Sequence, residues 1–231
     1  ARSKNTVSVH FLPFKLHSQG GKAMAEQLQK AIDATPDGFD ATILAYCLCN
    51  NGLLGLHSDK RPLVAFRSHD CIACLLGSRK YYEEEIERTP GTYWLSSGWL
   101  EQALGDASDM VSSLPSTPAP DDPKWLELVE KYGEDNAQFL WEEQRKMLAN
   151  YERMAYIDTG LGPQAALIEE GKQRAATLNL RFELLKGKRA WIDALLEGDW
   201  NEELFIVAKA GQKIAPRYDG SIATAVNEDG K

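Results

Sequence analysis

Hydrophobic residues follow two different patterns along this chain. Between residues 22 and 34 apolar side chains recur near helical spacing, with Ala25, Leu28 and Ile32 on one side. Residues 41–47 instead form a short apolar run without strict alternation, which is typical of a parallel strand buried on both faces. The first pattern predicts a helix and the second predicts a central strand.

The same succession of strand and helix continues along nearly the whole sequence. A helix capped by Ser68 or Asp70 is expected to continue to Glu87. The other expected strands are residues 7–14, 62–66, 92–95, 154–158, 181–185 and 204–208, and the other expected helices lie near residues 99–100, 124–151, 164–177 and 190–196. This order predicts an α/β fold, with a mostly parallel sheet covered by helices on both faces in a Rossmann-like, three-layer arrangement.

The length of 231 residues fits one α/β domain over residues 1–231, large enough to bury a core without disulfides or a structural metal. Residues 112–122 are rich in proline, serine and aspartate, which indicates an exposed linker or lid. We therefore expect a single domain that is interrupted by one irregular segment.

Charge and hydropathy restrict the classes of partner. The formal net charge of −8 disfavours nucleic acid, because phosphate binding relies on clustered lysine and arginine. No stretch approaches the roughly 18 apolar residues that span a bilayer. We expect a cytoplasmic protein with no membrane partner. Its expected partner is a small molecule or another protein, and a homo-oligomer stays open. A removed leader peptide would leave no trace in this sequence.

Chemistry-bearing residues concentrate between Cys47 and Cys74, where all four cysteines and two of the four histidines lie. Open parallel sheets place ligands beyond the carboxyl ends of their strands, and Cys49, His69 and Cys71 follow two such ends. Zinc favours thiolate and imidazole ligands, and three protein ligands with an open fourth position suit catalysis. The spacing is not that of a zinc ribbon, so iron or an iron–sulfur cluster stays open.

The remaining cysteines and histidines have other interpretations. Cys47 ends an apolar strand and Cys74 lies among apolar residues, so both are expected to pack in the core. Cys71 could instead be a metal-free nucleophile, with His17 or His57 as its base. His17, in a polar segment after the first expected strand, could also join the ligands.

A second candidate site is the loop Thr159-Gly160-Leu161-Gly162, which follows one expected strand and precedes a helix. Amide groups at such a position favour phosphate or carboxylate, although the full dinucleotide fingerprint is missing. Thr159, Gly160 and Gly162 are therefore candidate cofactor-binding residues. Together with Ser96 they are expected on the same rim of the sheet as the cysteines.

Several motifs resemble a known family, the domain of unknown function 1638. They are Leu-Ala-Tyr-Cys-Leu-Cys-Asn-Asn-Gly-Leu at residues 44–53, His-Asp-Cys-Ile at 69–72, Leu-Leu-Gly-Ser-Arg at 75–79, Pro-Gly-Thr-Tyr at 90–93, Tyr-Ile-Asp-Thr-Gly at 156–160 and Leu-Leu-Glu-Gly-Asp-Trp at 195–200. The resemblance spans most of the chain. It implies a site at Cys49, His69 and Cys71, with His17 as a fourth member, and a setting near corrinoid-dependent methyltransferases.

These observations lead to one functional hypothesis and two alternatives. The hypothesis is a metal-binding protein, with zinc on Cys49, His69, Cys71 and His17 and with Cys71 as the catalytic residue. It would act as a methyltransferase-like enzyme or component in one-carbon metabolism, on a small-molecule substrate or a corrinoid protein. The alternatives are an accessory module that binds a metal, a corrinoid or a methyltransferase partner, and a metal-free cysteine-nucleophile enzyme.

Overall fold

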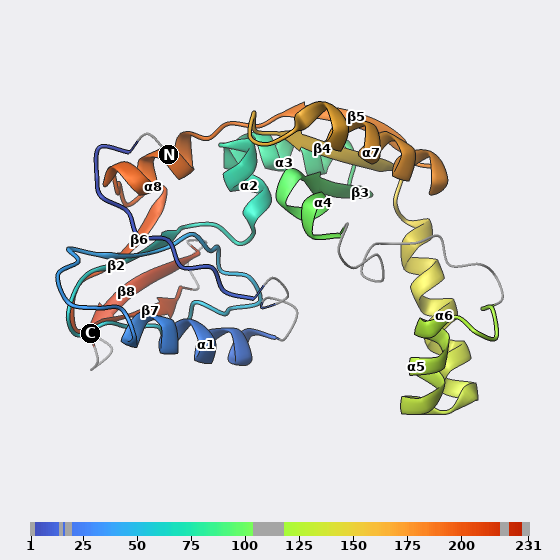
Figure 1. Ribbon diagram of the computed structural model, residues 1–231, viewed down its shortest axis with the longest axis horizontal. Helices are drawn as coiled ribbons and strands as arrows, with labels where there is room; N and C mark the ends of the chain where they lie inside the picture. The colour runs from blue at the N-terminus through green and yellow to red at the C-terminus, as the bar shows by residue number, and fades with distance from the viewer. Residues whose placement is uncertain (1–2, 14–15, 17–19, 104–117, 218–221, 228–231) are drawn as a thin grey trace. The chain divides into compact units, whose positions relative to one another are not determined.

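The computed structural model describes residues 3–13, 16, 20–103, 118–217 and 222–227. Two compact units make up the chain, one formed by Ala1–Tyr81 with Lys188–Lys231 and the other by Tyr82–Gly187. Figure 1 shows separate small sheets in the two units, β1-β2-β6 and β7-β8 in the first and β3-β4-β5 in the second. Each unit also has its own hydrophobic core. The α/β class is confirmed, while the expectation of a single domain over residues 1–231 stays a prediction.

The sheet of the first unit has the strand order β1-β2-β6. β1 (Thr42–Leu44) is parallel to β2 (Leu63–Phe66), and β2 is antiparallel to β6 (Phe205–Ala208). All four residues of β2 are buried, as expected for an apolar central strand. The antiparallel direction of β6 departs from the expected parallel order, because strand direction cannot be read from an apolar run.

The first unit also contains the helices α1 and α8 and a second pair of strands. α1 (Gly21–Asp33) buries Leu28 and Ile32 of the predicted stripe. Met24 is buried beside them, whereas Ala25 is only partly buried against the same core. β7 (Gln212–Pro216) and β8 (Ala223–Asn227) form an antiparallel pair that was not predicted, and Ile214 of β7 packs in the same core cluster as α1. α8 (Ala190–Glu197) buries Trp191 and Leu195. The strand expected at residues 7–14 is wrong over residues 7–13, which adopt no strand.

Glycine divides two helical regions that the sequence pattern joined. Gly77, at φ 70°, separates α2 (Cys71–Leu76) from α3 (Arg79–Arg88). A Cβ atom on Gly77 would lie 2.6 Å from the Cβ of Lys188, so both backbone conformation and space require glycine there. Gly133, at φ 77°, likewise separates α5 (Pro123–Tyr132) from α6 (Glu134–Ala149).

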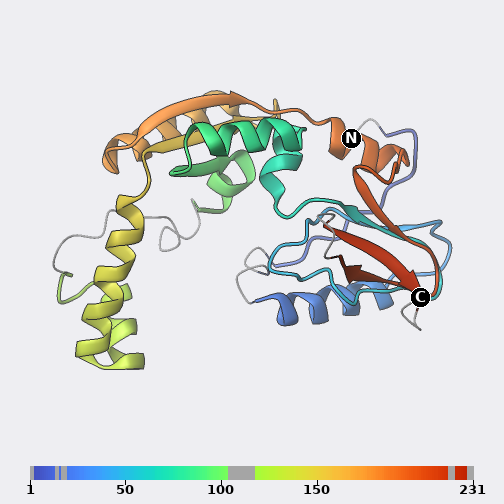
Figure 2. The same ribbon diagram turned by 180° about the vertical axis from the view of Figure 1, so that it is seen from behind.

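The second unit contains a fully parallel sheet with the order β3-β4-β5. Its strands are β3 (Thr92–Ser96), β4 (Arg153–Asp158) and β5 (Arg181–Lys186), and the helices beside it include α4 (Ser97–Ala103) and α7 (Gln164–Thr177). Side chains alternate between its two faces. Figure 1 shows α7 in front of the strands, and the opposite view in Figure 2 brings α3 to the front. This unit therefore has the predicted layers of helix, sheet and helix.

The segment expected as a linker or lid lies only partly within the described residues. Residues 112–117 are outside them, and residues 118–122 make a turn that leads into α5, where Asp122 caps the helix by accepting from Lys124 N at 2.9 Å. In the described part of the chain, no helix is long and apolar enough to cross a bilayer.

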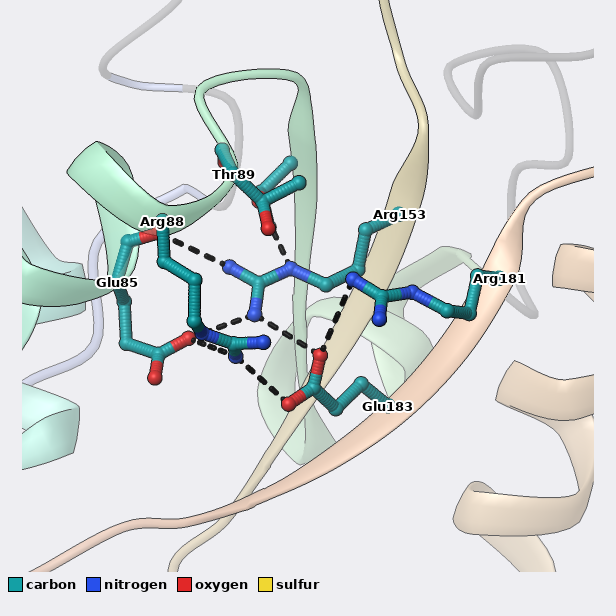
Figure 3. Close-up of polar contacts among 7 residues, drawn as sticks. Glu85, Arg88, Thr89, Arg153, Arg181 and Glu183 are labelled. Atoms are coloured by element: carbon teal, nitrogen blue, oxygen red, sulfur yellow. Dashed lines mark hydrogen bonds and ion pairs between the residues drawn. The ribbon is translucent and has the colours of Figure 1, made fainter.

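A buried arginine organises the face of the second sheet that α3 covers (Figure 3). Arg153 is fully buried, and its Nη1 donates to Glu85 at 2.6 Å and to Glu183 at 3.0 Å. Arg88 also donates to both carboxylates, at 2.6 and 2.7 Å. Arg153 is the first residue of β4, so this network lies at the amino end of the parallel strands. Ligands bind at the opposite end of such sheets, which favours a structural role.

Replacing Arg153 should destabilise the fold strongly. Arg153→Met leaves Glu85 buried with one fewer partner, and breaking a buried ion pair costs about 3 kcal/mol or more. Arg181→Met is the matched control, because Arg181 is exposed and lies 3.7 Å from the same Glu183; a surface pair contributes less than about 1 kcal/mol. Urea unfolding measures both variants, and equal losses would contradict the structural role of Arg153.

The same network should contribute to acid sensitivity. Burial alone would raise the pKa of Glu183, but hydrogen bonds from Arg88 and Arg153 outweigh it and hold the pKa below its ordinary 4.5. Since the folded pKa is lowered, this contribution is present above about pH 4.5 and is lost as the pH falls through the folded value. Urea unfolding between pH 7 and pH 3 should show that Glu183→Gln flattens the pH dependence of stability. The exposed Glu169→Gln control should not flatten it.

Candidate functional site

Two chain segments that follow β1 and β2 lie side by side at the carboxyl ends of these strands. The strands pair in parallel up to Leu44 and Ala65, and further backbone hydrogen bonds join the two segments beyond them. Leu48 N donates to Ser68 O at 2.9 Å, and Cys49 N donates to His69 O at 3.1 Å. The sequence from Cys47 to Cys49 is thereby fixed beside the sequence that leads to Cys71.

The inner pair of thiols, Cys47 and Cys74, is packed in the core. Their sulfur atoms lie 3.3 Å apart, and the two residues are only 2% and 3% exposed. Both belong to a cluster that includes Phe66, Trp191 and Phe205. The hydrogen bond with Cys74 and burial raise the pKa of Cys47 far above its ordinary value. The prediction that these two cysteines pack in the core is confirmed, but their mutual contact was not foreseen.

The outer thiols, Cys49 and Cys71, lie nearer the surface. Cys49 is half-buried and packs against the same cluster, and Cys71 is exposed at the start of α2. Desolvation, together with the nearby Cys49 and Asp70, raises the pKa of Cys71 to about 12. Desolvation also raises the pKa of Cys49. The structure thus brings the four cysteines within electrostatic reach of one another, and the pKa values of Cys47, Cys49 and Cys71 are all raised.

Local hydrogen bonds place the start of α2. The Asp70 carboxylate accepts from Ile72 N at 2.9 Å, which confirms Asp70 as the helix cap. The Ser68 hydroxyl donates to Asp70 O at 2.8 Å and closes the turn that precedes the helix. His69, between these two residues, is exposed and follows β2 as the sequence predicted.

The turn that carries Cys49 has an unusual backbone. Cys49, Asn50 and Asn51 all have positive φ angles, at 36°, 52° and 64°. Asparagine tolerates the left-handed region, whereas this conformation costs most other residues about 1–2 kcal/mol. Gly21 of α1 lies directly against this turn, because a Cβ atom on it would be 2.0 Å from Asn50 O. Packing against α1 therefore holds Cys49 in a backbone conformation that is rare for cysteine. Residues in such conformations are concentrated at functional sites.

The predicted metal ligands are only partly assembled. Cys49, His69 and Cys71 lie on the two adjacent segments, whereas His17 is outside the described residues. Over the residues that are described, no group of three or more histidine, cysteine or acidic side chains is already arranged to hold a metal ion. The chemistry of the donors fits zinc, but closing a ligand set requires side-chain rotation. The metal site stays a prediction.

The second predicted site lies in the other unit. Thr159, Gly160 and Gly162 follow β4, and Ser96 ends β3, so these residues belong to a different sheet from the cysteines. Gly160 N donates to the Asp158 carboxylate at 2.8 Å, so this amide already binds an anionic group of the protein. The cofactor role of this loop stays a prediction.

One feature absent from the sequence reasoning is a cavity of about 190 Å³ in the first unit, lined by residues that include His57, Lys60 and Arg61. Arg61 inside it donates to Pro36 O at 2.7 Å and lies 3.6 Å from Asp37. This cavity is smaller than the roughly 300 Å³ at which ligand pockets begin. Arg61 thus makes its contacts within the fold. No motif in the sequence indicated this cavity.

This architecture is that of an α/β protein with a thiol cluster at the carboxyl ends of two parallel strands. Its sequence matches the model of a family described as protein of unknown function (DUF1638) over residues 11–196, and the chain belongs to that family. The match includes all four cysteines and the parallel sheet of the second unit. No curated protein and no solved structure matches the chain.

Adding a methyl group to Gly21 should disturb the Cys49 turn. Gly21→Ala places a Cβ atom against Asn50 O, and overpacking of this kind costs about 1–3 kcal/mol. Gly98→Ala is the control, because Gly98 is exposed in α4 and has open space around it; alanine there should be neutral or stabilising. Thermal unfolding and the alkylation rate of Cys49 by iodoacetamide report the effect. Wild-type values for both in Gly21→Ala would show that the turn does not depend on α1.

Proposed function

We propose that this protein binds a thiophilic metal ion, zinc in the first place, through Cys49, His69 and Cys71, with His17 as a further ligand. The observation that carries the proposal is the hydrogen bond from Cys49 N to His69 O, which fixes the two ligand-bearing segments side by side. Thiolate and imidazole are the ligands that zinc prefers. A position beyond parallel strand ends is also where α/β proteins bind their ligands.

The electrostatic state of the thiols favours a metal over a metal-free nucleophile. With a pKa of about 12, Cys71 would be a thiolate in only about one molecule in 10⁵ at neutral pH. Catalytic cysteines instead have lowered pKa values and positively charged neighbours. A bound cation would add positive charge beside the sulfur atoms and favour the thiolate form. This contrast supports metal binding as the role of the outer thiols.

The reaction that we propose is methyl-group transfer in one-carbon metabolism, on a small-molecule substrate or a corrinoid protein. Zinc, when bound, would lower the pKa of a coordinated thiol or water and make it nucleophilic. Cys71, exposed at the start of α2, would face the substrate, and the packed Cys49 would fix the site to the core. An accessory module that binds a metal, a corrinoid or a methyltransferase partner uses the same site without turnover.

A reducing, cytoplasmic location belongs to this proposal. Four cysteines without a disulfide persist most readily where cellular thiols keep them reduced. Metal ligands also require free thiols, so an oxidising compartment would compete with metal binding.

Metal analysis tests the proposal directly. Freshly purified wild-type protein should contain close to one equivalent of zinc, and the Cys49→Ser, Cys71→Ser double variant should contain little. His10→Gln is the control, since His10 is exposed and lies outside the cluster. Circular dichroism confirms that each variant is folded. Equal and negligible zinc in the wild type and the double variant would refute the proposal.

Metal affinity should also rise steeply with pH. The raised pKa values keep Cys49 and Cys71 protonated at neutral pH, so binding must release one proton from each thiol. Zinc affinity should therefore increase about a hundredfold between pH 6.5 and pH 7.5, or tenfold per thiol. Competition with a chromophoric chelator measures this slope. An affinity that does not change with pH would exclude thiol ligands.

A further inference from the structure

The inner pair, Cys47 and Cys74, has a feature that metal binding by the outer thiols does not use. Its sulfur atoms lie 3.3 Å apart in the core, although the residues are 27 positions apart in the sequence. A disulfide bond is about 2.05 Å long, so the two sulfur atoms need to approach by only about 1.2 Å.

The surrounding residues separate this pair from solvent. Cys47 and Cys74 are 2% and 3% exposed, within the cluster that includes Phe66 and Trp191. A dissolved oxidant therefore cannot reach either sulfur directly. Cys71, however, is exposed and lies one helical turn from Cys74 on α2. The cluster thus combines an accessible thiol with a buried pair.

We propose that Cys47 and Cys74 form a redox-active dithiol that a low-molecular-weight disulfide oxidises through Cys71. This activity depends on the arrangement of the thiols in the metal-free protein and goes beyond metal binding. A sequence of Cys-x-x-Cys beside a strand and a helix is a pattern that redox proteins use. In this protein Cys71 and Cys74 form that sequence, and Cys47 adds a third thiol next to Cys74.

The reaction consists of three thiol–disulfide exchanges. The minor thiolate form of Cys71 attacks the external disulfide, which makes this first exchange slow at neutral pH. One half of the disulfide stays on Cys71, and the other half leaves and takes up the proton of Cys71. The Cys74 sulfur then attacks the Cys71 sulfur, and the second external thiol leaves with the proton of Cys74. Finally the Cys47 sulfur attacks the Cys74 sulfur, and its proton returns to Cys71. The external disulfide is reduced to two thiols, and Cys47 and Cys74 are oxidised to one disulfide.

Oxidised glutathione is the probe for this reaction. Reduced, metal-free protein is incubated with it, quenched with iodoacetamide, digested and mapped by mass spectrometry. The expected product links Cys47 to Cys74, leaves Cys49 and Cys71 alkylated, and lacks the mass of two hydrogen atoms. A product that links Cys49 to Cys71, a stable mixed disulfide on Cys71, or no oxidation would overturn the proposal.

Matched variants test the route through Cys71. Cys71→Ser should slow the formation of the Cys47–Cys74 link by about tenfold or more, whereas His10→Gln, at an exposed residue outside the cluster, should keep the wild-type rate. A wild-type rate in Cys71→Ser would exclude this route. Cys47→Ala, if folded by circular dichroism, should stop at species that involve Cys71; if it is unfolded, the map of the wild type decides alone.

This test is independent of the zinc measurement. The zinc content is determined on reduced protein, and the disulfide is mapped on metal-free protein. A protein that binds no zinc but forms the Cys47–Cys74 link would contradict only the proposed function. A protein that binds zinc and forms no such link would contradict only this inference.

Discussion

The hydrogen bonds that extend the pairing of β1 and β2 beyond the strands are the interaction on which the thiol cluster depends. Both are backbone hydrogen bonds, from Leu48 N to Ser68 O and from Cys49 N to His69 O. They therefore join the two segments independently of the side chains. Adjacent parallel strands end at the same edge of a sheet, so the residues that follow them lie close together. Without these two bonds the cysteines would belong to two independent loops.

The four thiols differ in how deeply they are buried. Each segment supplies one inner and one outer cysteine, Cys47 with Cys49 and Cys74 with Cys71. The inner pair joins the core near Phe66 and Trp191, whereas the outer pair stays nearer solvent. Support from Gly21 of α1 keeps the left-handed turn at Cys49 in place. This division separates a surface on which a metal is proposed to bind from a buried pair with its own chemistry.

Sequence reasoning could locate elements with a strong apolar pattern, but not their pairing. The buried positions Leu28 and Ile32 of α1 and the buried run of β2 are confirmed because burial itself creates those patterns. β7 and β8 were missed because they are short and partly polar. Residues 7–13 mimic a strand, yet Val9 and Phe11 are 66% and 88% exposed. Likewise, the burial of Cys47 and Cys74 was predictable from their apolar neighbours, whereas their contact required the paired sheet.

We propose that thiols from both segments bind one metal ion. X-ray absorption at the zinc edge of zinc-loaded protein tests it most directly, since it reports the atoms bound to the metal. We expect a first shell with sulfur at about 2.3 Å and nitrogen at about 2.0 Å, and a loss of sulfur in the Cys49→Ser, Cys71→Ser variant. A first shell of oxygen and nitrogen alone, unchanged in that variant, would contradict it.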